Sequence, residues 1–247
     1  HLPREAGVPP ASTDVNAAYH VAGSVGPEKA EPRVHGDLRF EPSTIAGARV
    51  ATGSTAAFAV NGKDIAYKAD ATVADLDLQR VGTEFGVPAL AVDRYKSTIN
   101  GHIVADGHGT TPQAMDLTAS GTLEDTSILG GRLPQLTFDT TLSRDTMHVK
   151  AVGTFADVDP AVASGKPELA GTVAGSADVD ATVTNISTGV TPDSVQADAT
   201  IALHPSRIGS LDITRGNLEG SYRESVGDIR VLDVAGHDVN VQASGTL

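Results

Sequence analysis

Apolar and polar residues alternate with a period of two along most of this 247-residue chain. Ile65 and Tyr67 follow this alternation in one segment, and Leu136 and Phe138 follow it in another. Successive side chains of a strand point to opposite faces, so the pattern predicts strands with one apolar and one polar face. Such strands are typical of antiparallel sheets that are solvated on one side. We therefore predict an all-β protein with little helix.

Two hairpins are predicted where alternating runs meet turn residues. Asn61-Gly62 separates one pair of runs, and Ser143-Arg144-Asp145 separates another. Asn and Gly accept positive φ at low cost, which makes Asn-Gly a strong hairpin signal.

An internal repeat of about 80 residues is visible in the sequence. Three segments carry a strand followed by a serine and a glycine, and their serines, Ser43, Ser127 and Ser206, recur at nearly equal intervals. Repeats of this length stack as supersecondary units that share one continuous core. The predicted divisions are a lead-in over 1–19, then β-repeats over 20–110, 111–190 and 191–247.

The chain begins at His1 and ends within a predicted strand of the third repeat. We expect it to be a piece of a longer protein, with the third repeat truncated. Helix is expected in only two short segments, residues 75–85 and the equivalent residues 157–165. We expect each segment to leave the sheet and to cap its edge.

The composition excludes some kinds of binding partner and some kinds of chemistry. The net charge is −13, and the 18 basic residues are scattered, whereas binding to nucleic acid needs clustered Lys and Arg. The chain lacks cysteine, which excludes disulfides and a thiol nucleophile. Aromatic residues make up 4%, so any core is thin and built from small side chains.

Catalytic motifs are missing from the sequence. Gly171–Gly175 and Gly216–Gly220 have the glycine spacing of a nucleophile elbow, but their central residues are Val173 and Leu218. The eight histidines form no H-x-x-x-H pair. We predict no enzyme activity, no catalytic residue and no cofactor.

Asp-x-Asp occurs three times, at 75–77, 157–159 and 178–180. Paired carboxylates could hold Ca²⁺, which takes oxygen ligands, but the known calcium loops are absent. Turn-forming or solvated aspartates account better for the pattern, so no metal site is predicted and a calcium ion there stays an alternative.

The turns Ser43-Thr-Ile-Ala-Gly47 and Thr126-Ser-Ile-Leu-Gly-Gly131, with Ala119-Ser-Gly-Thr-Leu123 recurring at 243–247, resemble the AsmA-like and TamB-like proteins of diderm bacteria. The resemblance covers roughly residues 20–247. It implies an elongated antiparallel repeat sheet folded over into a taco-like groove with an apolar interior. It implies a periplasmic parent chain that is anchored in the inner membrane.

In that family the groove is thought to conduct phospholipid acyl chains between the membranes, or to aid outer-membrane assembly. The partners implied are these acyl chains, neighbouring repeats of the same chain and outer-membrane assembly proteins. Small residues such as Ala69, Ala119 and Gly121 are expected to leave room on the apolar face.

Twelve residues are predicted to line the groove: Phe40, Phe58, Ile65, Tyr67, Leu117, Leu123, Phe138, Val149, Phe155, Ile201, Leu203 and Val241. Two other functions stay open. A structural or adhesive β-repeat would fill its core and leave no continuous cavity. A polysaccharide-active enzyme would need clustered carboxylates and exposed aromatics, and the chain has no Trp.

Overall fold

A computed structural model describes residues 13–24, 33–84, 90–128, 130–164 and 166–246. These residues form one antiparallel sheet of seventeen strands, which confirms the all-β prediction. The strands are β1 Thr13–Asp14, β2 Ala17–Ser24, β3 Arg33–Phe40, β4 Ser43–Ile45, β5 Ala48–Val50, β6 Thr55–Asn61, β7 Asp64–Leu76, β8 Ile99–His108, β9 Asp116–Ile128, β10 Gly131–Ser143, β11 Thr146–Val158, β12 Gly171–Thr184, β13 Val195–Leu203, β14 Ser206–Ile208, β15 Leu211–Arg223, β16 Val226–Gly236 and β17 Asn240–Thr246.

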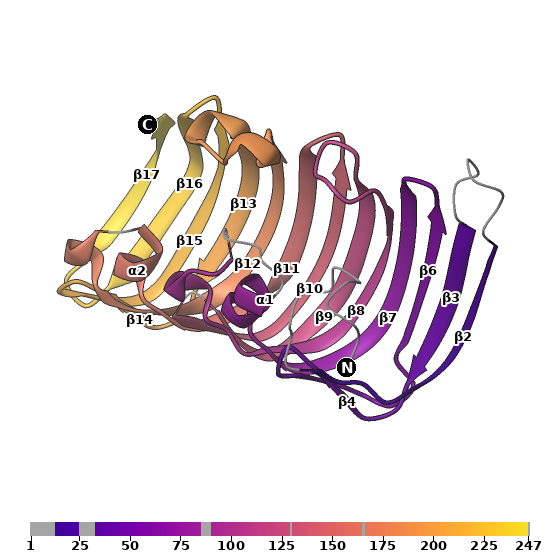
Figure 1. Cartoon of the computed structure of the whole chain (residues 1–247). Helices are drawn as coiled ribbons and strands as arrows, with labels where there is room; N and C mark the ends of the chain where they lie inside the picture. The colour runs from indigo at the N-terminus through magenta and orange to yellow at the C-terminus, as the bar shows by residue number, and fades with distance from the viewer. Residues whose placement is uncertain (1–12, 25–32, 85–89, 129, 165, 247) are drawn as a thin grey trace.

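The chain runs back and forth across the sheet as a meander (Figure 1). From β6 to β13 each strand pairs with the next one in the sequence. The short strands β1, β4, β5 and β14 prolong β2, β3, β6 and β13, so the seventeen strands occupy thirteen positions. β2 and β17 lie at the two opposite ends.

Two-residue loops join several of these strands. At the first predicted hairpin, Asn61 pairs with Asp64, so the loop is Gly62-Lys63 and not Asn61-Gly62. Gly62 alone supplies the positive φ there, at 61°, and Asn61 remains in the strand. At the second hairpin Ser143 pairs with Thr146, and the loop is Arg144-Asp145 with φ of 47° and 65°. These paired positive φ values match a type I′ turn, whose twist suits a hairpin.

A line of backbone irregularities crosses the sheet from strand to strand, and we call it the bend line. On β7, β9 and β11 it is marked by positive φ at Asp75, Asp125 and Asp157, at 59°, 42° and 55°. The pairing register shifts beside Asp75 and Asp157. Bulges of this kind bend a strand and increase its twist, and the strands curve along their length (Figure 1).

Side-chain hydroxyls satisfy the interrupted backbone at the bend line. Ser43, Thr126 and Ser206 each make the same set of contacts. Thr126 Oγ1 accepts a hydrogen bond from Asn100 N at 3.1 Å and lies 3.2 Å from Asn100 O and 3.4 Å from Glu124 O. The serine that marks the second repeat in the sequence, Ser127, is the neighbour of Thr126 and not the residue that makes these contacts.

The apolar core lies beside and beyond the bend line, where the short strands are. The buried apolar side chains of the described residues are all found there: Phe40, Ala46, Ala48, Val50, Ile99, Val173 and Ile213. The rest of the sheet has one packed layer only, since every strong strand–strand contact is between neighbours in the sheet.

Two short helices, α1 Leu78–Glu84 and α2 Pro160–Ser164, follow β7 and β11 at this same edge (Figure 1). The helical excursions predicted over 75–85 and 157–165 are therefore present but shorter. Four 3₁₀ turns complete the described helical residues: η2 Asp93–Tyr95, η3 Pro167–Leu169, η4 Ile186–Thr188 and η5 Pro192–Ser194.

Part of the predicted lead-in is strand. Thr13–Asp14 form β1, which pairs with β4, and residues 17–19 begin β2, which pairs with β3. Residues 1–12 lie outside the described residues, as does Leu247 at the end of the third predicted repeat.

Candidate functional site

All twelve residues predicted to line a groove lie on one face of the sheet. The pairing register shows this directly, because residues paired across neighbouring strands share a face. Phe58 pairs with Tyr67, and through Gly107 this row reaches Leu117. Leu123 belongs to a second row that extends through Leu136, Gly153 and Ala177 to Ile201.

The remaining members join the same face by register or by a spacing of two residues along a strand. Phe138 pairs with Gly121 in a row between the two above, and Val149 pairs with Thr140. Phe155 connects through Gly175 to Leu203 and onward to Val241 at the last strand. Phe40 and Ile65 lie two residues from Leu38 and Tyr67. We call this surface the apolar face.

The apolar face is largely uncovered among the described residues. Phe40 is 8% exposed and Val241 is 41% exposed, and the other ten predicted residues are half-buried. The whole chain exposes 15243 Å², whereas a compact monomer of this mass exposes only about 10,000 Å². Half-burial of the largest apolar side chains therefore results from a single-layered sheet.

Large side chains on this face lie over glycines of neighbouring strands. A Cβ added at Gly121 would sit 3.0 Å from Phe138 Cε1, and one added at Gly175 would sit 2.9 Å from Phe155 Cζ. Aromatic rings packed over strand glycines help to fix register. Gly121 was expected to leave room on the face, but its space is taken by the Phe138 ring.

Burial raises the pKa of the Tyr67 phenol above its ordinary value of 10.0. The cause is removal of the ring from water on the apolar face, which disfavours the charged phenolate.

The opposite face is polar and carries cross-strand ion pairs. Lys68 Nζ lies 2.6 Å from Asp106 Oδ2, and His102 Nε2 lies 2.7 Å from Asp70 Oδ1. These side chains are more than half exposed, so each pair contributes little to stability. At β7 and β8 the face opposite the apolar residues is therefore solvated.

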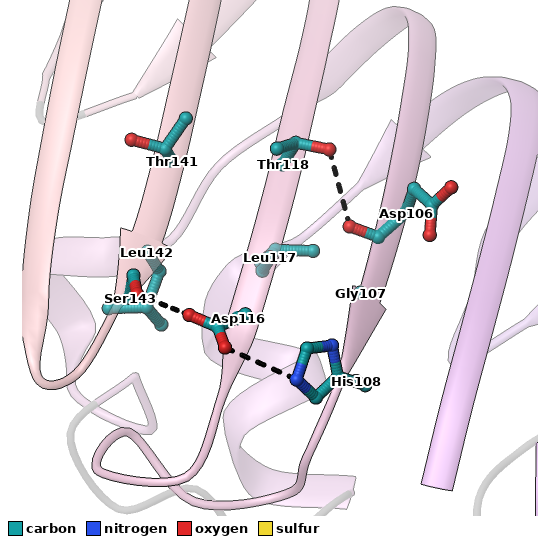
Figure 2. Close-up of a pocket in the computed structure, with 9 residues that line it drawn as sticks. All are labelled: Asp106, Gly107, His108, Asp116, Leu117, Thr118, Thr141, Leu142 and Ser143. Atoms are coloured by element: carbon teal, nitrogen blue, oxygen red, sulfur yellow. Dashed lines mark hydrogen bonds and ion pairs between the residues drawn. The ribbon is translucent and has the colours of Figure 1, made fainter.

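A shallow hollow on the polar face joins β8, β9 and β10 (Figure 2). Asp116 is its central residue: its Oδ2 lies 3.2 Å from His108 Nε2, and its Oδ1 accepts a hydrogen bond from the Ser143 hydroxyl. A serine hydrolase needs the histidine between the serine and the carboxylate. Here the Asp116 carboxylate lies between His108 and Ser143, so His108 cannot take the Ser143 proton directly. The three side chains instead connect the neighbouring strands β8, β9 and β10.

The Asp-x-Asp motifs at the bend line have structural roles. Asp77 Oδ1 accepts hydrogen bonds from Gln79 N at 3.0 Å and from Ser97 N at 3.1 Å. Asp159 Oδ1 does the same for Ala161 N at 2.9 Å and Gly171 N at 3.1 Å. Each carboxylate caps a helix start and ties it to the chain that returns to the sheet.

The third motif has a different setting. Asp178 and Asp180 pair with Val152 and Lys150 in the middle of β11, on the polar face. Among the described residues no group of three or more His, Cys, Asp or Glu side chains is arranged to hold a metal ion. The same residues contain no helix that is long and apolar enough to cross a membrane.

Two features of the site escaped the sequence patterns. The hydroxyl row at the bend line depends on Thr126, which sits beside a more obvious serine. The glycines under aromatic rings depend on cross-strand partners that are far apart in the sequence. The hydroxyl row could have been found from the near-equal spacing of Ser43, Thr126 and Ser206 along the chain.

Comparison of the chain with protein-family models, with curated proteins and with solved structures found no match.

Proposed function

We propose that the apolar face binds the acyl chains of phospholipids, and that the chain is a segment of a β-groove that conducts phospholipid between the membranes of a diderm envelope. One observation carries this proposal. The twelve predicted lining residues share a single face that extends from β3 to β17, and all of them except Phe40 keep part of their surface exposed.

The chemistry of the two faces suits such a ligand. An acyl chain gains about 0.8 kcal/mol for each CH₂ group that leaves water, and it needs no hydrogen-bond partner. The apolar face offers aliphatic and aromatic side chains, while Lys68, Asp106 and His102 keep the other face solvated. A surface of this kind holds a long apolar molecule along its length without recognising any one headgroup.

Repetition along the sheet supports a groove that lengthens by adding units. The equivalent hydroxyls of Ser43, Thr126 and Ser206 recur at nearly equal intervals along the chain. The two capping aspartates, Asp77 and Asp159, are separated by a similar interval. Within the proposal, these intervals correspond to β-repeats over 20–110, 111–190 and 191–247, and the bend line is where the sheet folds over.

The resemblance to AsmA-like and TamB-like proteins sets the cellular part of the proposal. It would place the chain in the periplasm, in a parent protein that is anchored in the inner membrane. Neighbouring repeats and outer-membrane assembly proteins would be its partners there.

The test is native mass spectrometry with lipid extraction, on the protein exported to the periplasm of a diderm bacterium. Co-purifying phospholipid is expected with the unaltered chain and with Thr137→Asp, which adds a charge to the polar face of β10. Phe138→Asp puts the same charge on the apolar face one residue away, and it should abolish the lipid. Circular dichroism checks that each variant is folded.

Ile201→Asp on β13 repeats the test at a distant position, in case Phe138→Asp does not fold. A lipid-free mass for the unaltered chain, or equal lipid in the variants of both faces, would contradict the proposal. Such a result would favour the structural or adhesive β-repeat, whose apolar face is covered by protein.

A further inference from the structure

A hollow of about 530 Å³ lies at the helical edge of the sheet, between the segment with α1 and η2 and the segment with α2. Asp93 and Lys96 line it from the first segment, Val162 lines it from α2, and Ile128 and Arg132 line it from the sheet between them. Its volume falls in the range of about 300–1,000 Å³ that is usual for small-molecule sites. We call this space the edge hollow.

Two cationic side chains of the edge hollow are available to a ligand. Lys96 is exposed, and no described acidic side chain forms an ion pair with its Nζ. Arg132 Nη1 lies 3.5 Å from Asp157 Oδ2, and its Nη2 lies 3.9 Å from Asp125 Oδ1. Strong charge-assisted hydrogen bonds are shorter, at about 2.7–2.9 Å. Both cations can therefore bind an anionic group without giving up a strong bond.

Asp93 adds a negative charge to the same space. Its Oδ1 accepts a hydrogen bond from Gln79 Nε2 at 2.7 Å, which holds the carboxylate in place. Its Oδ2 has no hydrogen-bond partner among the described residues, so it can accept a hydrogen bond from a cationic ligand group. A purely anionic ligand would be repelled by this carboxylate, whereas a zwitterion has a partner for each charge.

The charged residues of the edge hollow are not required by the local fold. The second helical segment has the same backbone arrangement: Lys96 N donates to Asp93 O at 3.0 Å, and Ala170 N donates to Pro167 O at 3.1 Å. In each segment the next amide binds the capping aspartate. Pro167 and Ala170 thus occupy the positions of Asp93 and Lys96 without any charge. The two charges therefore call for a role other than folding of the segment.

Apolar side chains lie beside these charges. Val162 is 60% exposed, and Ile128 is half-buried. Two further lining residues, Ser97 and Gly131, are buried, so the hollow borders the core beyond the bend line. Charged and apolar groups in one space suit a ligand that is zwitterionic at one end and apolar at the other.

We propose that the edge hollow binds a phosphoethanolamine group, with the phosphate beside Lys96 and Arg132 and the ammonium beside Asp93. The inference that this group is a phospholipid headgroup rests on the proposed function. The apolar face takes up acyl chains without recognising a headgroup, so the edge hollow supplies the selection that this face lacks. A water-soluble ester carries the same group, and the test separates the two sources.

The test is an NMR titration of the 247-residue protein with glycerophosphoethanolamine, which has no acyl chains. Saturable shifts are expected for the amides of Lys96, Ser97 and Arg132. Lys96→Glu should lower the affinity at least about tenfold, because it replaces attraction of the phosphate by repulsion. Lys63→Glu makes the same change in the β6–β7 loop and should leave the affinity unchanged. Absence of saturable binding, or equal weakening by both variants, would overturn the proposal.

Asp93→Asn tests recognition of the ammonium group. It should weaken binding of glycerophosphoethanolamine and should not weaken binding of glycerol 3-phosphate, which lacks the amine. Loss of affinity for both ligands would contradict the assigned role of Asp93. Asp93 and Lys96 are exposed, so both substitutions are expected to leave the fold intact.

A short-chain lipid, dihexanoylphosphatidylethanolamine, identifies the source of the group. Tighter binding of this lipid than of the soluble ester supports a headgroup site, and equal affinity would overturn that assignment. Phe138→Asp, which should remove lipid from the apolar face, should bind the soluble ester as the unaltered chain does. Failure of the edge hollow to bind the ester is thus distinguishable from failure of the apolar face to bind lipid.

Discussion

The ring of Phe58 lies over Gly36 on the neighbouring strand, so that a Cβ added to the glycine would be 2.7 Å from Phe58 Cε1. The two residues are direct partners of the β3–β6 pair, and Val21 Cγ2 closes the site at 3.0 Å. No other described layer covers this part of the apolar face. The contact therefore stabilises the sheet within its own single layer.

We expect Gly36→Ala to lower the free energy of unfolding by about 1–3 kcal/mol, because overpacking forces the ring from its position. Urea denaturation measures the change. In a Phe58→Ala background the same glycine substitution should cost far less, since the ring is gone. An equal cost in both backgrounds would show that the ring is not what limits Gly36.

Thr126→Val should destabilise the bend line by about 1–3 kcal/mol, because Asn100 N loses its acceptor at a position that excludes water. Thr126 is 1% exposed, which makes its hydroxyl the most buried of the row. Thr126→Ser keeps the hydroxyl and should retain most of the stability. Thr137→Val, on the exposed polar face, is the control and should change the free energy of unfolding little. A larger loss in the control than at Thr126 would refute this account.

Removing the carboxylate of Asp77 or Asp159 should loosen the short helix that follows it from the edge of the sheet. Asp77→Ala and Asp159→Ala are each expected to cost about 0.5–2 kcal/mol, the range for loss of a helix N-cap. Hydrogen exchange should accelerate at Ser97 N in the first variant and at Gly171 N in the second, because these amides share the same carboxylate. Exchange that stays unchanged at both amides would mean that the caps do not hold the returning chain.

The Tyr67 phenol should make stability depend on pH in the alkaline range. Its pKa is raised in the folded protein, so the phenol of the unfolded chain ionises first as pH rises above 10.0. The stabilising contribution is complete below that pH and is lost as pH rises through the folded pKa. Comparing urea denaturation at about pH 9 and about pH 11 should show a smaller loss in Tyr67→Phe than in the unaltered chain. An identical loss in both proteins would exclude Tyr67 as the source.

Much of the fold could be predicted from the alternation of apolar and polar residues along the chain. Because alternate residues of a strand share a face, the alternation at Ile65 and Tyr67 or at Leu136 and Phe138 identified the apolar face without any knowledge of strand order. That is why all twelve predicted residues lie on the same side. The short excursions after Asp77 and Asp159 were also visible, since each aspartate precedes the start of a short helix.

Local geometry was harder to predict where either of two adjacent residues could occupy the same loop position or make the same hydrogen bonds. Asn61-Gly62 was expected to form the hairpin loop, yet pairing of Asn61 with Asp64 moved the loop by one residue. Ser127 marked the second repeat in the sequence pattern, yet its neighbour Thr126 makes the contacts that Ser43 and Ser206 make. In both cases the strand register, which depends on partners across the sheet, chose between adjacent candidates.

The sequence by itself determined an all-β chain with one apolar and one polar face, because side-chain alternation is a local property of extended backbone. Only the tertiary structure decided that the described part of the apolar face stays single-layered and that the Phe58 and Phe138 rings cover Gly36 and Gly121. Those outcomes depend on which strands become neighbours, and such contacts join residues that the local pattern does not relate.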